Sequence, residues 1–170
     1  MNSSDIYLGL GSNTGRRSDN IRKAVREIKG NPHFSEVRVS YLYETKPVGP
    51  EQRDFVNAAL FARTDLEPAG LLKLLKRIEH RLGRKKSAVK WGPRSIDIDI
   101  LLYGDRLVDT RTLKIPHIEL PKRLFALIPL CDIAPDLRHP ALKKTLRGLR
   151  NELLLTYSKQ KDKIPVCRIK

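Results

Sequence analysis

The sequence predicts a mixed α/β (α+β) fold of the ferredoxin-like sandwich type, in which helices cover a mainly antiparallel sheet. Short segments of alternating apolar residues are interleaved with segments whose apolar residues recur at helical spacing. In chain order these segments run β-α-β-β-α-β-α, without an internal repeat. The length of 170 residues is enough for one domain with a substantial core.

The first half of the chain holds three predicted strands and one helix. Residues 5–10 form the first strand, and Gly9-Leu10-Gly11-Ser12-Asn13 is interpreted as the tight turn that ends it, because it lacks the Lys-Ser/Thr of a P-loop. Ser18 is predicted to cap a helix that stops at Gly30. Residues 36–44 and 55–62 form the next strands, joined by a loop that is long for a hairpin.

The second half begins with a helix opened by Glu67 and Pro68, with Gly83 where its C-terminal cap would lie. On this helix Glu79 is expected to form a surface ion pair with Lys76. A strand at 96–102 and a helix at about 122–132 follow. We assign residues 1–150 to one domain and residues 151–170 to a basic, solvated tail without a function.

The formal net charge of +15 favours polyanionic partners but does not choose between nucleic acid, an anionic membrane and a nucleotide. The chain has no apolar run of about 18 residues that would span a membrane, and its N-terminus lacks the features of a signal peptide. We therefore expect a soluble cytoplasmic protein, with a monomer as the default. The two cysteines have no metal-site spacing, and Cys131 is expected in the core.

The most informative motif places two carboxylates inside an apolar, β-branched run. In a strand over 96–102, Asp97 and Asp99 share one face, and the isoleucines between them share the other. Such a pair can hold two Mg²⁺ ions, as in two-metal phosphoryl-transfer sites. A solvated edge or salt bridges are the alternative interpretations. Because the segment 84–94 carries five cationic side chains, a metal-bound polyphosphate is favoured.

Several other residues have two interpretations each. Phe55 and Asn57 share a face and could bind a flat heterocycle, although taken alone they favour a core phenylalanine and an asparagine that satisfies a turn. Arg123 and Phe125 could complete a clamp around a ring, but Phe125 alone would be assigned to the core. His117 either donates to a phosphate or caps the last helix.

Taken together, four segments resemble the 6-hydroxymethyl-7,8-dihydropterin pyrophosphokinase family of folate biosynthesis. The segments are Gly9-Leu10-Gly11-Ser12-Asn13, Pro47-Val48-Gly49-Pro50 with Phe55 and Asn57, Trp91-Gly92-Pro93-Arg94-Ser95-Ile96-Asp97-Ile98-Asp99, and Pro116-His117 through Arg123 and Phe125. The third segment is the most specific. The resemblance extends over about residues 5–150.

The resemblance implies Mg²⁺-dependent transfer of pyrophosphate from ATP to the pterin hydroxymethyl group, leaving AMP. It implies that Asp97 and Asp99 hold two Mg²⁺ ions. Arg84 and Arg94 would neutralise developing charge, and His117 would contact the ATP phosphates. The remaining implied contacts stack on the pterin, bind its polar edge or close the site, and they come from Phe55, Phe125, Asn57, Thr45, Pro47, Val48, Arg123 and Trp91.

Phe55 departs from the Tyr that many relatives carry, which keeps the stacking surface but removes a hydroxyl. Two other classes are weighed against the resemblance. A ferredoxin-like nucleic-acid-binding module would suit the charge of +15, but Asp97 and Asp99 would repel a phosphate backbone. A two-metal nuclease would use the same carboxylates, but it has no evident use for Phe55, Asn57 and Phe125 together.

Overall fold

The structure, a computed structural model, describes residues 3–47, 51–84, 92–159 and 166–169. Its centre is a six-stranded sheet with the order β5-β1-β4-β3-β8, in which β2 also pairs with β4 and all pairings are antiparallel. The strands are β1 (Ser4–Ser12), β2 (Phe34–Val39), β3 (Tyr43–Thr45), β4 (Phe55–Thr64), β5 (Asp97–Tyr103) and β8 (Val166–Arg168). A separate ribbon consists of β6 (Val108–Asp109) and β7 (Lys114–Ile115).

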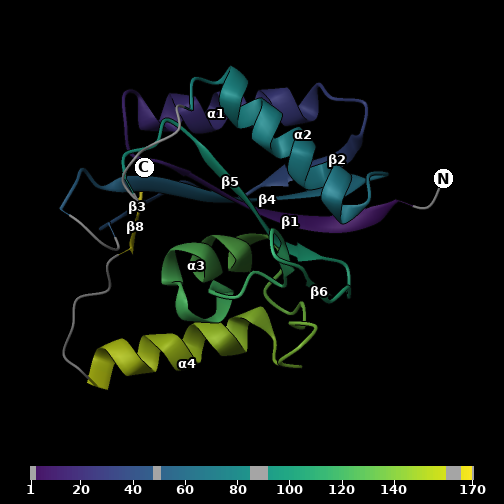
Figure 1. The fold of residues 1–170 in the computed structure, drawn as a ribbon. Helices are drawn as coiled ribbons and strands as arrows, with labels where there is room; N and C mark the ends of the chain where they lie inside the picture. Colours follow the sequence, from purple (N-terminus) through teal and green to yellow (C-terminus); the bar gives the residue numbers. More distant parts are fainter. Residues whose placement is uncertain (1–2, 48–50, 85–91, 160–165, 170) are drawn as a thin grey trace.

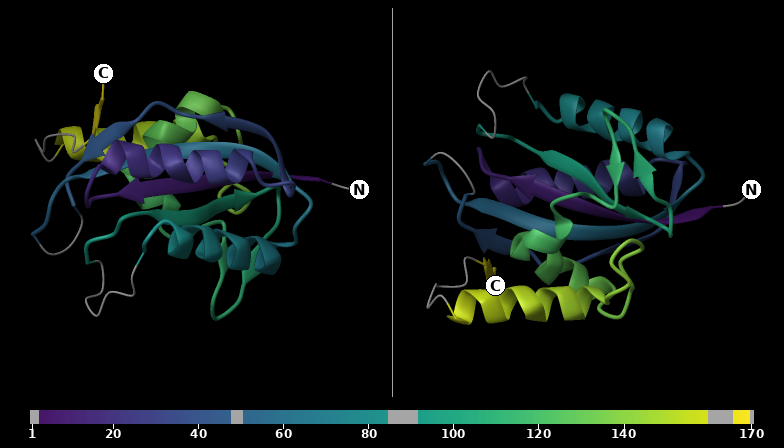
Figure 2. Two further views of the ribbon diagram at one scale, coloured as in Figure 1. Left: turned by 90° about the horizontal axis from the view of Figure 1, so that it is seen from above. Right: turned by 60° about the horizontal axis from the view of Figure 1, so that its bottom comes forward.

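Helices cover both faces of this sheet (Figures 1 and 2). One face carries α1 (Arg17–Lys29) and α2 (Pro68–Arg81). The other carries α3 (Leu124–Ile133), preceded by the 3₁₀ turn η1 (Leu120–Lys122), and α4 (Leu146–Lys159) lies on the outer side of α3. The predicted α+β sandwich with a mainly antiparallel sheet is therefore confirmed.

The central strands supply a core on each face of the sheet. From β1, Ile6, Leu8 and Leu10 pack with α1 and α2, while Tyr7 packs with α3. Burying one such side chain stabilises the fold by about 1.5–3 kcal/mol. Because a shift of one residue would expose these side chains, their alternation determines which face of each strand lies against α3. Cys131 of α3 belongs to the second core, as predicted.

The strand β5 shows the alternation that the sequence predicts. Ile96, Ile98 and Ile100 are buried in the core beneath α1 and α2. Asp97 and Asp99 consequently face the α3 side, where they line a cavity. The interpretation of this motif as a solvated sheet edge is therefore wrong.

Three element boundaries differ from the predictions. The strand β1 continues through Gly9 and Gly11 to Ser12, so the glycine segment is not a turn. The helix α1 begins at Arg17 and no side chain caps it, so Ser18 lies inside the helix. The predicted strand 36–44 is split into β2 and β3. At Ser40 the side-chain hydroxyl accepts the Ala59 N–H at 2.9 Å, in place of a backbone carbonyl.

The predicted solvated tail contains a helix and a strand among its described residues. The helix α4 runs through residue 150 to Lys159, because Leu146, Leu149 and Leu153 recur at helical spacing and pack against the α3 core. The strand β8 pairs with β3. These described residues of the tail are therefore folded, although most of their side chains are exposed.

In the ranges that the structure describes, none of the helices has both the length and the apolar character needed to cross a bilayer.

Candidate active site

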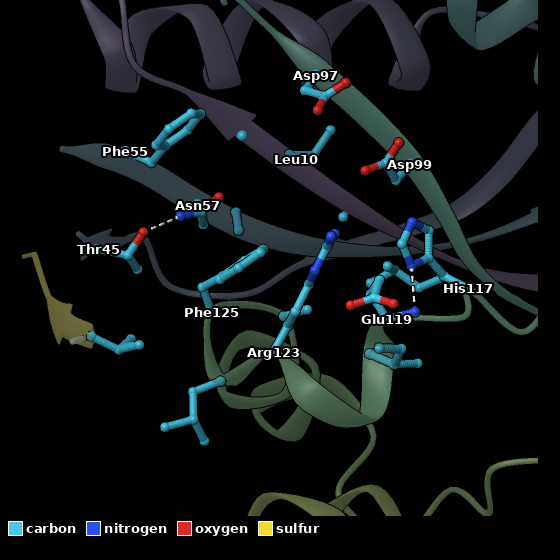
Figure 3. Close-up of a pocket in the computed structure, with 18 of the residues that line it drawn as sticks. Leu10, Thr45, Phe55, Asn57, Asp97, Asp99, His117, Glu119, Arg123 and Phe125 are labelled. Atoms are coloured by element: carbon cyan, nitrogen blue, oxygen red, sulfur yellow. Dashed lines mark hydrogen bonds between the residues drawn. The ribbon is translucent and has the colours of Figure 1, made fainter. Parts of the chain in front are cut away.

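A cavity of about 400 Å³ opens on the α3 side of the sheet, above β1, β4 and β5 (Figure 3). Its floor includes two glycines of β1, the strand that lies between β4 and β5. Gly11 pairs with Asn57 on β4 and with Asp97 on β5, and Gly9 pairs with Asp99 on β5. Because glycine has no side chain, β1 leaves open space between the amide on one side and the carboxylates on the other. The segment interpreted as a turn therefore forms the floor of the cavity.

One end of the cavity combines aromatic rings with an amide. Phe55 on β4 and Phe125 on α3 lie on either side of Asn57 (Figure 3). The Asn57 amide nitrogen donates to the Thr45 hydroxyl at 2.7 Å, which fixes the orientation of the buried amide. Phe55 and Phe125 both line the cavity, and Phe125 also packs against the core on the α3 side, so the pair can hold a flat ring between them.

The opposite end carries most of the charge. Asp97 accepts from Arg84 at 2.6 Å through one carboxylate oxygen and from Arg94 through the other. Burial raises the pKa of Asp97, but Arg94 and Arg84 outweigh burial and hold that pKa below its ordinary value. Asp99 differs, because burial and the neighbouring charge of Asp97 both raise its pKa. The pair therefore already contains salt bridges, which the sequence offered as an alternative to metal binding.

Glu79 lies next to the charged end of the cavity and contacts both Arg84 and the backbone of β5. The residue is 2% exposed, so the prediction of a surface ion pair is wrong in its location, although the Lys76 contact exists at 2.9 Å. Its carboxylate also accepts from the Ile98 N–H at 2.6 Å and contacts Arg84 at 2.5 Å. Burial raises the pKa of Glu79, against the effect of Lys76 and Arg84. Glu79 thus links β5 to Arg84, which in turn reaches Asp97.

His117 lies beside Asp99 at the charged end (Figure 3). Its Nδ1 accepts the Glu119 N–H at 3.2 Å, which leaves the proton of the neutral ring on Nε2. Burial lowers the pKa of His117, and Asp99 opposes that effect only in part. A neutral imidazole with a free N–H suits hydrogen bonding to a phosphate oxygen.

Arg123 extends from the start of α3 into the middle of the cavity (Figure 3). Its guanidinium carbon lies 5.5 Å from the centre of the Phe125 ring, which is within cation–π range. Arg123 therefore stands between the aromatic end and the carboxylates.

Most of the predicted site residues meet in this one cavity: Thr45, Phe55, Asn57, Arg94, Asp97, Asp99, His117, Arg123 and Phe125. Arg84 and Pro47 are described but do not line it. Val48 and Trp91 lie outside the described residues.

Sequence reasoning missed other residues of the wall. Lys122 and Glu119 had no motif, although they stand beside His117 and Arg123 in the chain. Tyr157 and Val166 come from the predicted tail. Glu79 could have been recognised, because it falls on the apolar stripe of its helix, four residues after the buried Leu75.

Among the residues that the structure describes, no three His, Cys, Asp or Glu side chains are grouped closely enough to hold a metal ion by themselves.

A family model described as 7,8-dihydro-6-hydroxymethylpterin-pyrophosphokinase (HPPK) matches residues 7–135. The chain belongs to this family. The match confirms the resemblance that the sequence motifs indicated, and it covers every predicted site residue. The HPPK family consists of pyrophosphokinases, which favours an enzyme over a nucleic-acid-binding module.

Relatives of the HPPK family are similar to this chain over most of its length. A 2-amino-4-hydroxy-6-hydroxymethyldihydropteridine pyrophosphokinase of Aquifex aeolicus is 45% identical over 149 residues, which is 86% of this chain and 91% of the relative. A protein of the same name from Pseudomonas aeruginosa is 43% identical over 136 residues, 79% of this chain and 83% of the relative.

Solved HPPK structures support the fold. The wild-type HPPK-DHPS of Plasmodium falciparum matches with a TM-score of 0.77 and 18% identity, over 99% of this chain and 44% of that chain. The chain thus spans somewhat less than half the length of this solved structure. The helix α4 and the strand β8 lie beyond the HPPK family-model match, although both contribute to the cavity.

Proposed function

We propose that this protein transfers pyrophosphate from ATP to 6-hydroxymethyl-7,8-dihydropterin, yielding AMP and the pterin diphosphate, in folate biosynthesis. One observation carries the proposal: in a chain of the HPPK family, a single cavity has an aromatic and amide end next to a charged end. The first suits a flat, polar heterocycle and the second suits a polyphosphate.

The aromatic end binds the pterin in this proposal. Phe55 and Phe125 stack on its two faces, and Asn57 reads its polar edge with the amide held by Thr45. Arg123 lies beside the ring, with its guanidinium near Phe125. The family resemblance adds Pro47, Val48 and Trp91 to the proposed pterin contacts, of which Val48 and Trp91 lie outside the described residues.

The charged end binds the triphosphate. Asp97 and Asp99 fit two Mg²⁺ ions, because Mg²⁺ is commonly held by one or two carboxylates together with substrate phosphates. When bound, Mg²⁺ neutralises phosphate charge and helps to align the reacting groups. Arg84 and Arg94 neutralise Asp97 in the structure. With metal on that carboxylate, both guanidinium groups would be available to phosphate oxygens.

The reaction requires positioning rather than a covalent intermediate. The pterin hydroxyl oxygen forms a bond to the β-phosphorus of ATP, the bond from that phosphorus to the α–β bridging oxygen breaks, and the hydroxyl proton leaves to solvent. Arg94 and the His117 Nε2 proton would stabilise the charge that develops on the phosphate oxygens. Gly11 lies between Asn57 and Asp97 on the neighbouring strands, so the proposed sites of the two substrates are adjacent.

The cytoplasm is the proposed compartment. Cys131 and Cys167 are both free thiols, which a reducing compartment maintains.

AMP formation from ATP tests the proposal, with and without the pterin and Mg²⁺. We expect AMP only when both are present, and Asp97→Asn to lower kcat by at least about 100-fold, comparable to removing one charge-stabilising group. Asp65→Asn is the matched control, since Asp65 is an exposed carboxylate paired with His33, just beyond the end of β4 that lies opposite Phe55. ADP or inorganic phosphate in place of AMP would contradict the proposal.

A further inference from the structure

The strand β8 forms a wall of the cavity that the proposed function does not use. It pairs with β3 in antiparallel register, so that Val166 stands opposite Thr45. Val166 and Thr45 both line the cavity, as does Tyr157 near the end of α4. Figure 3 shows β8 beside Thr45, at the end that holds Asn57 and away from Asp97 and Asp99.

Several contacts fix β8 at this position. The Ile169 N–H donates to the Leu42 carbonyl at 2.9 Å, and the Ile169 side chain packs against the core under α1 and α2. The Arg168 guanidinium carbon lies 3.2 Å from the centre of the Tyr41 ring. The edge of the sheet therefore holds the C-terminal strand through backbone, apolar and cation–π contacts.

The same edge is tied to the helix that carries Phe125. Asp132 on α3 accepts from the Tyr43 hydroxyl at 2.9 Å and from the Tyr41 N–H at 3.2 Å. Burial and Asp132 raise the pKa of Tyr43 to about 12, so its hydroxyl remains a donor across the physiological range. Through β3, the position of β8 is thus set relative to Phe125.

The side chains of β8 alternate between two surroundings. Val166 is half-buried against the cavity, whereas the next residue, Cys167, is exposed. Since successive side chains on a strand point to opposite faces, Cys167 points away from the cavity. Val166 places apolar surface opposite Thr45, which accepts the Asn57 hydrogen bond, and the Tyr157 ring lines the same cavity. Apolar surface at that point keeps water from competing for the amide.

Resting on the proposed function, we infer that two residues from the C-terminal part of the chain belong to the pterin site: Val166 of β8, opposite Thr45, and Tyr157 of α4 form a wall of the cavity that selects a compact planar heterocycle. The carboxylates and His117 lie at the other end, so the contribution is specific to the heterocycle and leaves the nucleotide phosphates unaffected.

The test compares two full-length variants that add the same charge to adjacent residues of β8. Val166→Asp puts a carboxylate into the apolar wall, and Cys167→Asp puts it on the exposed side. We expect Val166→Asp to raise the pterin KM by about tenfold or more, since a charge facing an apolar pocket must stay hydrated. The KM for ATP should change less than about twofold in both variants, and Cys167→Asp should keep the pterin KM of the wild type.

A third variant tests the same wall without a substitution in β8, in case Val166→Asp disrupts that strand. Tyr157→Ala removes the other apolar wall from α4 without touching the β3–β8 pairing, and it should raise the pterin KM by about two- to fivefold at an unchanged KM for ATP. Equal effects of Val166→Asp and Cys167→Asp, or a pterin KM that neither Val166→Asp nor Tyr157→Ala moves, would overturn the inference. Failure of the wild type to form pterin-dependent AMP would instead refute the proposed function, and the inference with it.

Discussion

Gly11 separates the heterocycle end of the cavity from the carboxylates, and its missing side chain is what keeps that space open. A methyl group added there would lie 3.0 Å from the Asn57 side-chain oxygen, closer than ordinary contacts, and Thr45 holds that amide in place. Gly11→Ala should therefore displace the amide and raise the pterin KM by about fivefold, roughly the loss of one good hydrogen bond. Steady-state kinetics with each substrate varied in turn measures the effect.

The companion variant is Gly9→Ala, two residues earlier on the same face of β1. Its added carbon would meet the flexible end of Leu101 at 3.3 Å, which can move aside. We expect Gly9→Ala to leave the pterin KM near that of the wild type. If both variants raise it equally, the effect comes from the strand as a whole and not from contact with Asn57.

His139, in the connection between α3 and α4, predicts a pH dependence of stability. The ring is buried, its Nδ1 accepts the Leu142 N–H at 3.2 Å, and its Nε2 has no hydrogen-bond partner among the described residues. Burial lowers the pKa of His139 below the ordinary value of 6.5. Between the two pKa values the unfolded chain binds more protons than the folded one, so this contribution to stability is present above pH 6.5 and is lost as the pH falls toward the folded pKa.

His139→Asn keeps an acceptor for the Leu142 N–H but cannot titrate. The melting temperature of the wild type should fall more steeply than that of His139→Asn between pH 7 and pH 5, a range of about two units around the free histidine pKa. Thermal denaturation over a pH series measures both slopes, and parallel curves would contradict the assignment.

At the scale of elements, Asn13 joins two segments that border the site. Its carboxamide oxygen accepts the Arg94 N–H at 2.7 Å, and its nitrogen donates to Gln52 at 2.8 Å. The side chain is 2% exposed, so these bonds are shielded from water. Asn13 therefore couples the segment carrying Arg94 to the loop before Phe55.

Asn13→Ala should lower stability by about 2 kcal/mol, from the lost side-chain hydrogen bonds, and kcat/KM by about threefold. The effect on kcat/KM is modest because the Asn13 N–H still donates to the Arg94 carbonyl at 3.0 Å and Arg94 still pairs with Asp97. Urea denaturation and steady-state kinetics measure the two effects. Asn20→Ala is the control, since the Asn20 side chain on α1 bonds to Ser12 at 3.2 Å and to the Thr14 carbonyl at 3.0 Å, next to Asn13 in the chain but without a bond to the Arg94 segment among the described residues. An equal loss of kcat/KM in the control would mean that the turn, not the coupling, matters.

The elements also show which parts of the structure could be predicted from sequence. Local alternation was sufficient for β5, where the isoleucines and carboxylates separate cleanly between the two faces. Alternation did not predict the interruption at Ser40. There the Ser40 hydroxyl, in place of a backbone carbonyl of the strand, accepts the Ala59 N–H. The local pattern also predicted a turn at Gly9 and Gly11, because their place inside β1 depends on the pairing of β1 with β4 and β5.

The sequence predicted those cavity residues that lie together in one short motif. It did not predict those that come from segments far apart in the chain. Asp97, Asp99 and Arg94 stand in one short segment, and Phe55 and Asn57 in another. The approach of Val166 to Thr45 joins residues far apart in the chain through a three-residue strand pairing. No local pattern indicates such a pairing, because a short edge strand has too few residues to show periodicity.

At the scale of the whole molecule, the net charge of +15 acts on the two proposed substrates differently. ATP is a polyanion, and a strongly positive protein raises its local concentration and its rate of association. The pterin is uncharged in its ring, so this field has little effect on it. The charge therefore predicts a salt dependence for one substrate and not for the other.

Raising KCl from about 0.05 M to about 0.5 M shortens the screening length from more than 10 Å to about 4 Å. We expect the KM for ATP to rise severalfold over this range, at fixed free Mg²⁺, while the pterin KM stays nearly constant. The pterin serves as an internal control for any effect of salt on folding. Parallel changes in both KM values would indicate that salt acts on the fold. If neither KM changes, the positive field does not serve ATP binding, and inhibition of AMP formation by added RNA would then show whether it serves a nucleic-acid partner.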